Sequence, residues 1–127
     1  MRLLLDTHVF LWWLAGLRVI PAATRAALVA ASEIHVSAVT GYEITLKHAA
    51  GKLPGVGLVA QDVAAAIRRA GFNELPITCA HAEAAGRLPR HHRDPFDRIL
   101  VAQALLEGLT LVSADTTLDG FGIARLW

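Results

Sequence analysis

The chain of 127 residues has the length of one domain, which is enough to fold around a single core without disulfides or a structural metal. Its formal charge of +1 argues against a polybasic, histone-like binder of nucleic acid. Hydrophobic residues make up 54% of the chain and charged residues only 18%, so we expect apolar surface to remain for a partner or a second copy of the chain.

The cations are nearly all arginine, because Lys47 and Lys52 are the only lysines. Arginine suits bidentate phosphate contacts, and an arginine-rich composition is equally typical of a GC-rich genome. Cys79 is the only cysteine, so one chain can form neither a disulfide nor a cysteine zinc site, which fits a reducing cytoplasm. The uncharged segment 7–17 is too short to span a bilayer, and we interpret it as a buried turn and helix.

Strand-like and helix-like patterns alternate along the chain. In chain order they predict a strand at 3–6, helices at 9–15 and 21–32, a strand at 34–37, a helix at 39–50, a loop at 51–57, a helix at 58–70, a weak strand at 75–78, a helix at 80–88, a basic connection at 89–93, a helix at 94–107, a strand at 109–113 and an edge strand at 124–127. This alternation predicts an α/β fold, with one domain over residues 1–127, a mainly parallel central sheet and helices on both faces.

Four acids occupy the part of such a fold where ligands gather: Asp6, Glu43, Asp97 and Asp115. Asp6 closes a run of leucines and Asp115 follows the strand at 109–113, so each lies at the carboxyl end of a predicted strand. Parallel strands bring these ends to one edge of the sheet. Carboxylates crowded there repel one another unless a hard cation neutralises them. The pattern therefore predicts a divalent metal site.

Asp6 has no cap or turn partner that the local pattern supplies, which favours a functional role. Asp94 is suited to cap the helix at 94–107, because Pro95 follows at the first helical position. Asp97 at the third position complements the helix dipole, yet it can also point across the sheet edge at Asp6. We therefore predict that Asp94 is the cap and Asp97 a metal ligand.

The two other acids have structural alternatives that the pattern leaves open. Thr40 and Glu43 have the spacing of a capping box, and Asp115 is suited to a turn or a helix cap. The six histidines show no HxH or HExxH spacing, so we do not expect zinc. His91 and His92 are neighbours whose side chains are expected to diverge.

Several longer stretches carry a resemblance to a known family: residues 3–8, 11–13, 36–37, 43–47, 92–104 and 111–115. In this order they make the chain resemble a PIN domain of the VapC type, the toxin half of bacterial and archaeal toxin–antitoxin pairs. The block 93–104 is highly specific. Gly41 and Tyr42 depart from the family, where a bulkier apolar residue and tryptophan tend to precede Glu43.

The resemblance implies an endoribonuclease that cleaves single-stranded or structured RNA with Mg²⁺ or Mn²⁺. In such an enzyme Asp6 and Asp97 are the expected direct ligands, while Glu43 and Asp115 complete the site, orient waters or hold a second ion. Further candidates act around these acids: Thr7 and Ser37 as supporting hydroxyls, and Arg90, Arg93 and Arg98 as contacts to RNA phosphates. Arg98 has the alternative of pairing with a site acid.

The resemblance also implies partners, namely a VapB-like antitoxin and a second copy of the chain in a homodimer. An antitoxin helix could cover the apolar residues around 9–15 and 46–53. Another Mg²⁺ phosphotransfer enzyme is a rival, but a dehalogenase-like phosphatase has Asp-x-Asp where this chain has Asp6-Thr7-His8. That phosphatase and a receiver domain both need a late lysine, and none follows Lys52. A catalytically silent PIN-fold binding module is the second rival, and the presence of all four acids argues against it.

Overall fold

The computed structural model describes residues 1–17 and 19–127. Within these residues the strands are β1 (Arg2–Leu5), β2 (Glu33–Ser37), β3 (Asn73–Leu75), β4 (Thr110–Val112) and β5 (Arg125–Leu126). They form one sheet in the order β3-β2-β1-β4-β5, in which every pair is parallel. The predicted parallel sheet is confirmed.

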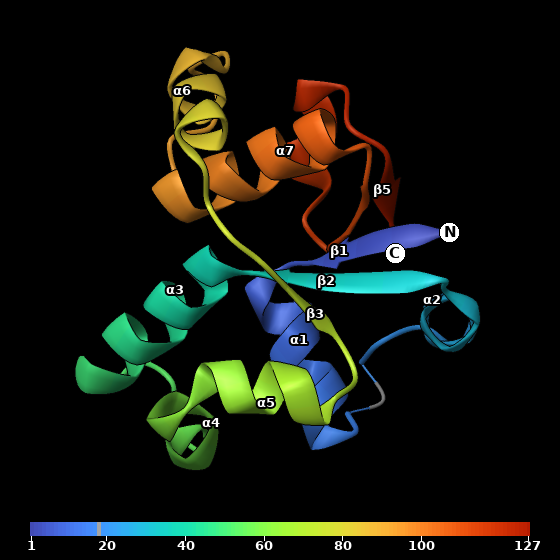
Figure 1. The fold of residues 1–127 in the computed structure, drawn as a ribbon, viewed down its shortest axis with the longest axis vertical. Coiled ribbons are helices and arrows are strands. Elements are labelled where there is room, and N and C mark those ends of the chain that lie inside the picture. Colours follow the sequence, from blue (N-terminus) through green and yellow to red (C-terminus); the bar gives the residue numbers. More distant parts are fainter. Residues whose placement is uncertain (18) are drawn as a thin grey trace.

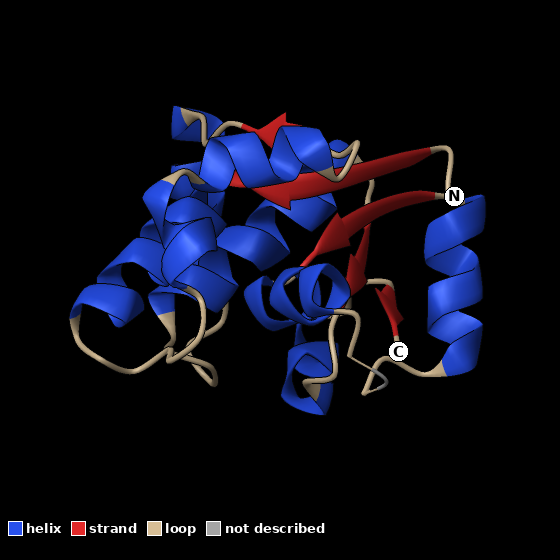
Figure 2. Cartoon of the chain, turned by 90° about the horizontal axis from the view of Figure 1, so that it is seen from below, coloured by secondary structure: helices blue, strands red, loops and turns tan. Residues whose placement is uncertain are grey.

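The helices of the described residues are α1 (Thr7–Ala15), α2 (Ala22–Ala30), α3 (Ala38–Ala49), α4 (Gly57–Gln61), α5 (Val63–Arg69), α6 (Cys79–Arg87), α7 (Pro95–Glu107) and the 3₁₀ helix η1 (Thr116–Phe121). Figure 1 shows α6 and α7 on one side of the sheet and α1 and α5 on the other. Figure 2, turned by 90°, shows the strands side by side with helices flanking them. Helices therefore cover both faces, as the alternating pattern predicts.

The leucine run of β1 belongs to two cores, because successive side chains of a strand point to opposite faces. Leu3 and Leu5 pack in the cluster that includes Phe10 of α1. Leu4 packs in the opposite cluster, which includes Leu100 of α7. All three leucines of this central strand have no exposed surface. A strand that is covered on both faces has a continuous run of apolar residues, rather than an alternation of apolar and polar residues.

Two predicted elements differ from the structure, and one element of the structure was not predicted. The helix expected at 58–70 is two helices, because Asp62 leaves helical geometry (φ −158°, ψ 83°) and its side chain caps α5 by accepting from the amide of Ala65. The strand expected at 75–78 lies upstream, where Asn73 pairs with His35 of β2. The pattern did not predict η1. None of the described helices is long and apolar enough to cross a bilayer.

Candidate metal centre

A cavity of about 130 Å³ contains all four predicted acids. It is lined by Asp6, Thr7, His8, Glu43, Lys47, Asp94, Asp97 and Asp115. The chain builds the sheet outward from β1 to β3 and then returns to the other side of β1 with β4. Asp6 follows β1 and Asp115 follows β4, so the cavity lies where the strand order reverses, which is the usual ligand crevice of an open parallel sheet. The catalytic role of these acids stays a prediction.

Asp6 has a structural partner that the sequence analysis did not find. Its carboxylate accepts a 2.8 Å hydrogen bond from the amide of Val9 and so caps α1, which begins at Thr7 rather than Val9. The expectation that Asp6 has no local cap was wrong. Burial nevertheless raises the pKa of Asp6, although the Ser113 hydroxyl and the Val9 amide favour its charged form. The charged carboxylate is therefore incompletely compensated by the groups around it.

Glu43 lies inside α3 rather than at its start, since α3 begins at Ala38 and Ser37 caps it. The capping box with Thr40 was therefore wrong. The buried Glu43 carboxylate instead accepts a 2.6 Å hydrogen bond from the Thr7 hydroxyl and pairs with Lys47 one turn further along α3. Thr7 holds Glu43 from α1, as a supporting hydroxyl would.

Asp94 and Asp97 take different positions at the start of α7. Asp94 caps the helix by accepting from the amides of Phe96 and Asp97 at 2.9 and 3.1 Å, so its predicted capping role is seen in the structure. Asp97 points into the cavity, where its Oδ2 lies 2.8 Å from Nε2 of His92. Burial raises the pKa of Asp97 more than the hydrogen bond from His92 lowers it.

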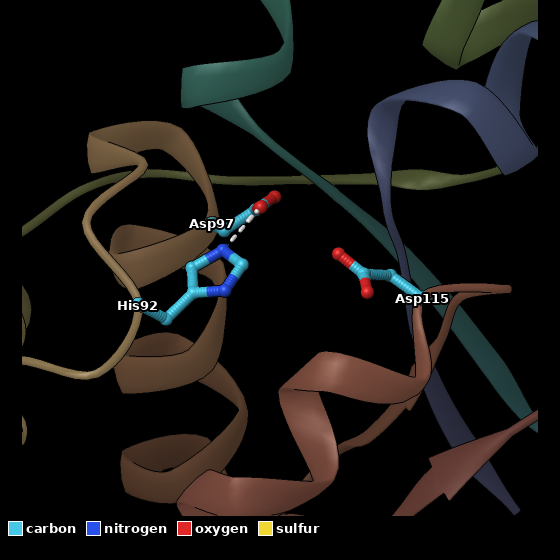
Figure 3. Close-up of side chains that lie close together, drawn as sticks. All are labelled: His92, Asp97 and Asp115. Carbon is cyan, nitrogen blue, oxygen red and sulfur yellow. Dashed lines mark hydrogen bonds and ion pairs between the residues drawn. The ribbon is translucent and has the colours of Figure 1, made fainter.

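Asp115 both caps η1 and lines the cavity. It accepts from the Thr117 amide at 3.0 Å and from the Thr117 hydroxyl at 2.6 Å, and this hydroxyl lowers the pKa of Asp115. Figure 3 shows His92, Asp97 and Asp115 facing one space. One ligand atom from each lies within 4.8 Å of the other two. This mixed set of carboxylate oxygens and one imidazole nitrogen fits a divalent metal ion.

Ser37 and the arginines lie apart from the acids. Ser37 is fully buried, accepts from the Val39 amide and lines another cavity. Arg98 donates to four backbone carbonyl groups, so its pairing with a site acid is not observed. Arg90 and Arg93 are exposed, make no ion pair within the described part of the chain, and line a cavity of about 420 Å³ together with Arg98.

Sequence reasoning missed three residues around the acids: Lys47, His92 and Ser113. The spacing of Lys47 from Glu43, one helical turn, could have indicated their ion pair. His92 gave no such signal, because it lies in a loop whose path depends on Arg98, which donates to the His92 carbonyl at 2.9 Å. Ser113 approaches Asp6 only because β4 lies next to β1 in the sheet.

Comparison with solved structures finds the same fold in toxin–antitoxin complexes. A chain of the toxin–antitoxin complex from Klebsiella pneumoniae is 21% identical with a TM-score of 0.68, and the match covers 98% of this chain and 95% of that one. For DNA-bound VapBC from Salmonella typhimurium the identity is 17%, the TM-score 0.72 and the coverage 99% and 97%. FitAcB from Neisseria gonorrhoeae is 22% identical with a TM-score of 0.67, and the match covers 98% of this chain and 96% of that one.

At these identities the likeness to solved structures shows the fold alone. No curated protein matches the chain. The sequence model of the PIN domain family, however, matches residues 3–123, which is nearly the whole chain. The match includes all four acids, the strands β2, β3 and β4, and β1 from its second residue onward. The chain therefore belongs to the PIN domain family.

Proposed function

We propose that the protein is a metal-dependent endoribonuclease and the toxin of a VapBC-type toxin–antitoxin pair, acting in the cytoplasm. The observation that carries the proposal is the convergence of Asp6, Glu43, Asp97 and Asp115 on one cavity at the switch point of a PIN domain. Burial raises the pKa of Asp6 and of Asp97, so a bound cation would stabilise the charged form of both.

The side chains at this cavity have different proposed roles. Asp6 and Asp97 are the proposed direct ligands of Mg²⁺ or Mn²⁺. Thr7 and Lys47 hold the Glu43 carboxylate from two sides, which leaves it oriented to position water at the site. The Thr117 hydroxyl lowers the pKa of Asp115, whose carboxylate completes the site and can bind the same ion. The divalent ion, when bound, supplies charge neutralisation at the phosphate under attack and lowers the pKa of a bound water.

RNA contacts are proposed for two exposed arginines in the loop between α6 and α7. Arg90 and Arg93 line a cavity with room for a phosphate, and neither is engaged by an acid of the described chain. Their guanidinium groups are suited to bidentate contacts with a backbone phosphate. Arg98 is excluded from this role by its backbone hydrogen bonds and is better described as a structural residue.

The toxin assignment draws support from apolar surface as well as from the solved complexes. Tyr42 and Leu46 on α3 and Leu58 on α4 are 60%, 46% and 82% exposed, and Leu14 on α1 is 37% exposed. An amphipathic helix of an antitoxin would cover such residues and approach the acidic cavity beside them. We propose that a VapB-like antitoxin binds there and that the chain forms a homodimer.

Cleavage of a labelled single-stranded RNA with Mg²⁺ or Mn²⁺ and with EDTA tests the enzyme. We expect cleavage with either ion and none in chelator. Asp97→Asn should lower the rate by at least about 100-fold because a ligand is lost. Asp94→Asn is the matched control, since asparagine still caps α7 and its rate should stay within about threefold of the wild-type rate. Full activity in EDTA, or equal losses in the two variants, would contradict the assignment.

Expression in cells tests the toxin role and the silent-module alternative together. The protein expressed alone should slow growth, and co-expression with a small upstream open reading frame should restore growth and yield one complex. A binding module without activity would leave growth unchanged and would leave RNA intact at every metal concentration. Sequencing the RNA ends produced soon after induction would identify the substrate.

A further inference from the structure

His92 connects two of the acids although the sequence analysis gave it no role. It lies in the loop between α6 and α7, with Nε2 at 2.8 Å from Oδ2 of Asp97 and Nδ1 at 3.3 Å from Oγ1 of Thr117. Thr117 in turn contacts Oδ1 of Asp115 at 2.6 Å. The imidazole therefore contacts Asp97 of α7 directly and Asp115, the cap of η1, through Thr117, and Figure 3 shows the three side chains around one space.

The hydrogen bonds of Thr117 assign Nδ1 of His92 as a donor. A threonine hydroxyl has one hydrogen. The contact to Asp115 uses it, because a carboxylate oxygen accepts there and this 2.6 Å contact is much shorter than the 3.3 Å contact to His92. The Thr117 oxygen is then left to accept, so Nδ1 of His92 is the donor in the 3.3 Å contact. Nε2 is then the ring nitrogen left to face Asp97.

Nε2 lies 2.8 Å from Oδ2 of Asp97, where a proton between the two atoms makes the hydrogen bond of the metal-free protein. Two acceptors at this distance repel one another unless a proton or a cation lies between or beside them. A histidine that binds a metal through one nitrogen usually donates its other N–H to a neighbouring acceptor, which fixes the ring orientation. Here the oxygen of the Thr117 hydroxyl is the acceptor for Nδ1 of His92, and the same hydroxyl donates to Asp115.

The ring is also held in place by the loop that carries it. Arg98 donates to the His92 carbonyl at 2.9 Å and to the Pro89 carbonyl at 2.8 Å. Phe121 of η1 packs against the His92 ring edge to face, with centroids 5.9 Å apart and planes at 72°. A ligand oriented in advance loses little conformational entropy when the ion binds.

We propose that Nε2 of His92 is a ligand of the divalent ion that Asp97 and Asp115 bind, and that the site therefore prefers Mn²⁺ to Mg²⁺. The inference rests on the metal site of the proposed nuclease and adds a nitrogen to its ligands. Nε2, a carboxylate oxygen of Asp97 and one of Asp115 all lie within 4.8 Å of one another, so one ion can contact all three after small side-chain adjustments. Mg²⁺ strongly prefers oxygen ligands, whereas a first-row transition metal also accepts imidazole.

Electron spin-echo spectroscopy of the Mn²⁺-loaded full chain gives a direct test that does not depend on activity. The wild-type protein should show modulation from a directly bound ¹⁴N, and labelling histidine with ¹⁵N should change it. His92→Gln should abolish it. His91→Gln is the matched control, because the His91 ring packs against the Phe121 ring with centroids 4.5 Å apart and offers no atom to the cluster of His92, Asp97 and Asp115. His8→Gln is the second control, because His8 lines the acidic cavity. Both controls should retain the modulation.

Calorimetric titration of the same proteins with Mn²⁺ and with Mg²⁺ gives the second readout. We expect His92→Gln to raise the Kd for Mn²⁺ about tenfold and the Kd for Mg²⁺ less than about twofold. Absence of ¹⁴N modulation in the wild-type protein, its survival in His92→Gln, or an equal change in both Kd values would overturn the inference. If one of these outcomes is found and the wild-type protein still binds Mn²⁺ and cleaves RNA, the proposed nuclease stands without the nitrogen ligand. A wild-type protein that binds neither ion overturns both.

Discussion

Replacing Arg98 by methionine should destabilise the protein strongly, because the guanidinium holds the turn from α6 into the loop before α7. Nη1 donates to the carbonyls of Pro89 and His92 at 2.8 and 2.9 Å, and Nη2 to those of Ala85 and Leu88, both at 2.8 Å. A hydrogen bond to a charged group contributes about 1.5–3 kcal/mol. Water can replace part of this at a half-exposed loop, so we expect a loss of about 3 kcal/mol in total.

Urea unfolding followed by circular dichroism, in EDTA, measures this free energy of unfolding. Arg98→Met should lower the midpoint with little change in the slope, since the amount of surface exposed on unfolding stays similar. Arg93→Met is the control, because Arg93 is exposed and its change should stay within about 0.5 kcal/mol. If Arg98→Met were as stable as Arg93→Met, the four hydrogen bonds would not stabilise the fold, and Arg98 would again be a candidate for RNA contacts.

Three other perturbations test the cavity and its surroundings. Asp6→Asn should raise the free energy of unfolding of metal-free protein at pH 7.5, because burial raises the pKa of Asp6 and its charge destabilises the fold above that pKa. The gain should shrink as the pH falls through the carboxyl range. Thr7→Val should lower the free energy of unfolding by about 1.5–3 kcal/mol, since the buried Glu43 carboxylate loses its 2.6 Å donor. Thr7→Ser keeps a hydroxyl donor and should therefore retain most of this free energy. Replacing Arg90 and Arg93 together by methionine should reduce the salt dependence of RNA binding, measured as the slope of log K against log salt, by about 1.4.

Features that depend on residues close together in the sequence could be predicted from it. Asp94 caps α7 as expected, because Asp-Pro at a helix start is encoded by local backbone geometry. The strand at the leucine run was also found, since three consecutive apolar residues before an acid indicate a strand buried on both faces. The break at Asp62 was missed, because apolar spacing continues across it and only the backbone angles reveal the second helix.

The order of strands and helices, with acids at their ends, was enough to predict that Asp6, Glu43, Asp97 and Asp115 meet at one cavity. How these acids are held depends on contacts that form only in the folded chain. Thr7 meets Glu43 across a separation of 36 residues, and His92 meets Thr117 across 25. Local propensity acts over about one helical turn, so it cannot encode contacts of this range. The first contact arises because the sheet places β2 beside β1, and the second because the sheet places β4 beside β1 while Arg98 directs the His92 loop to the same edge.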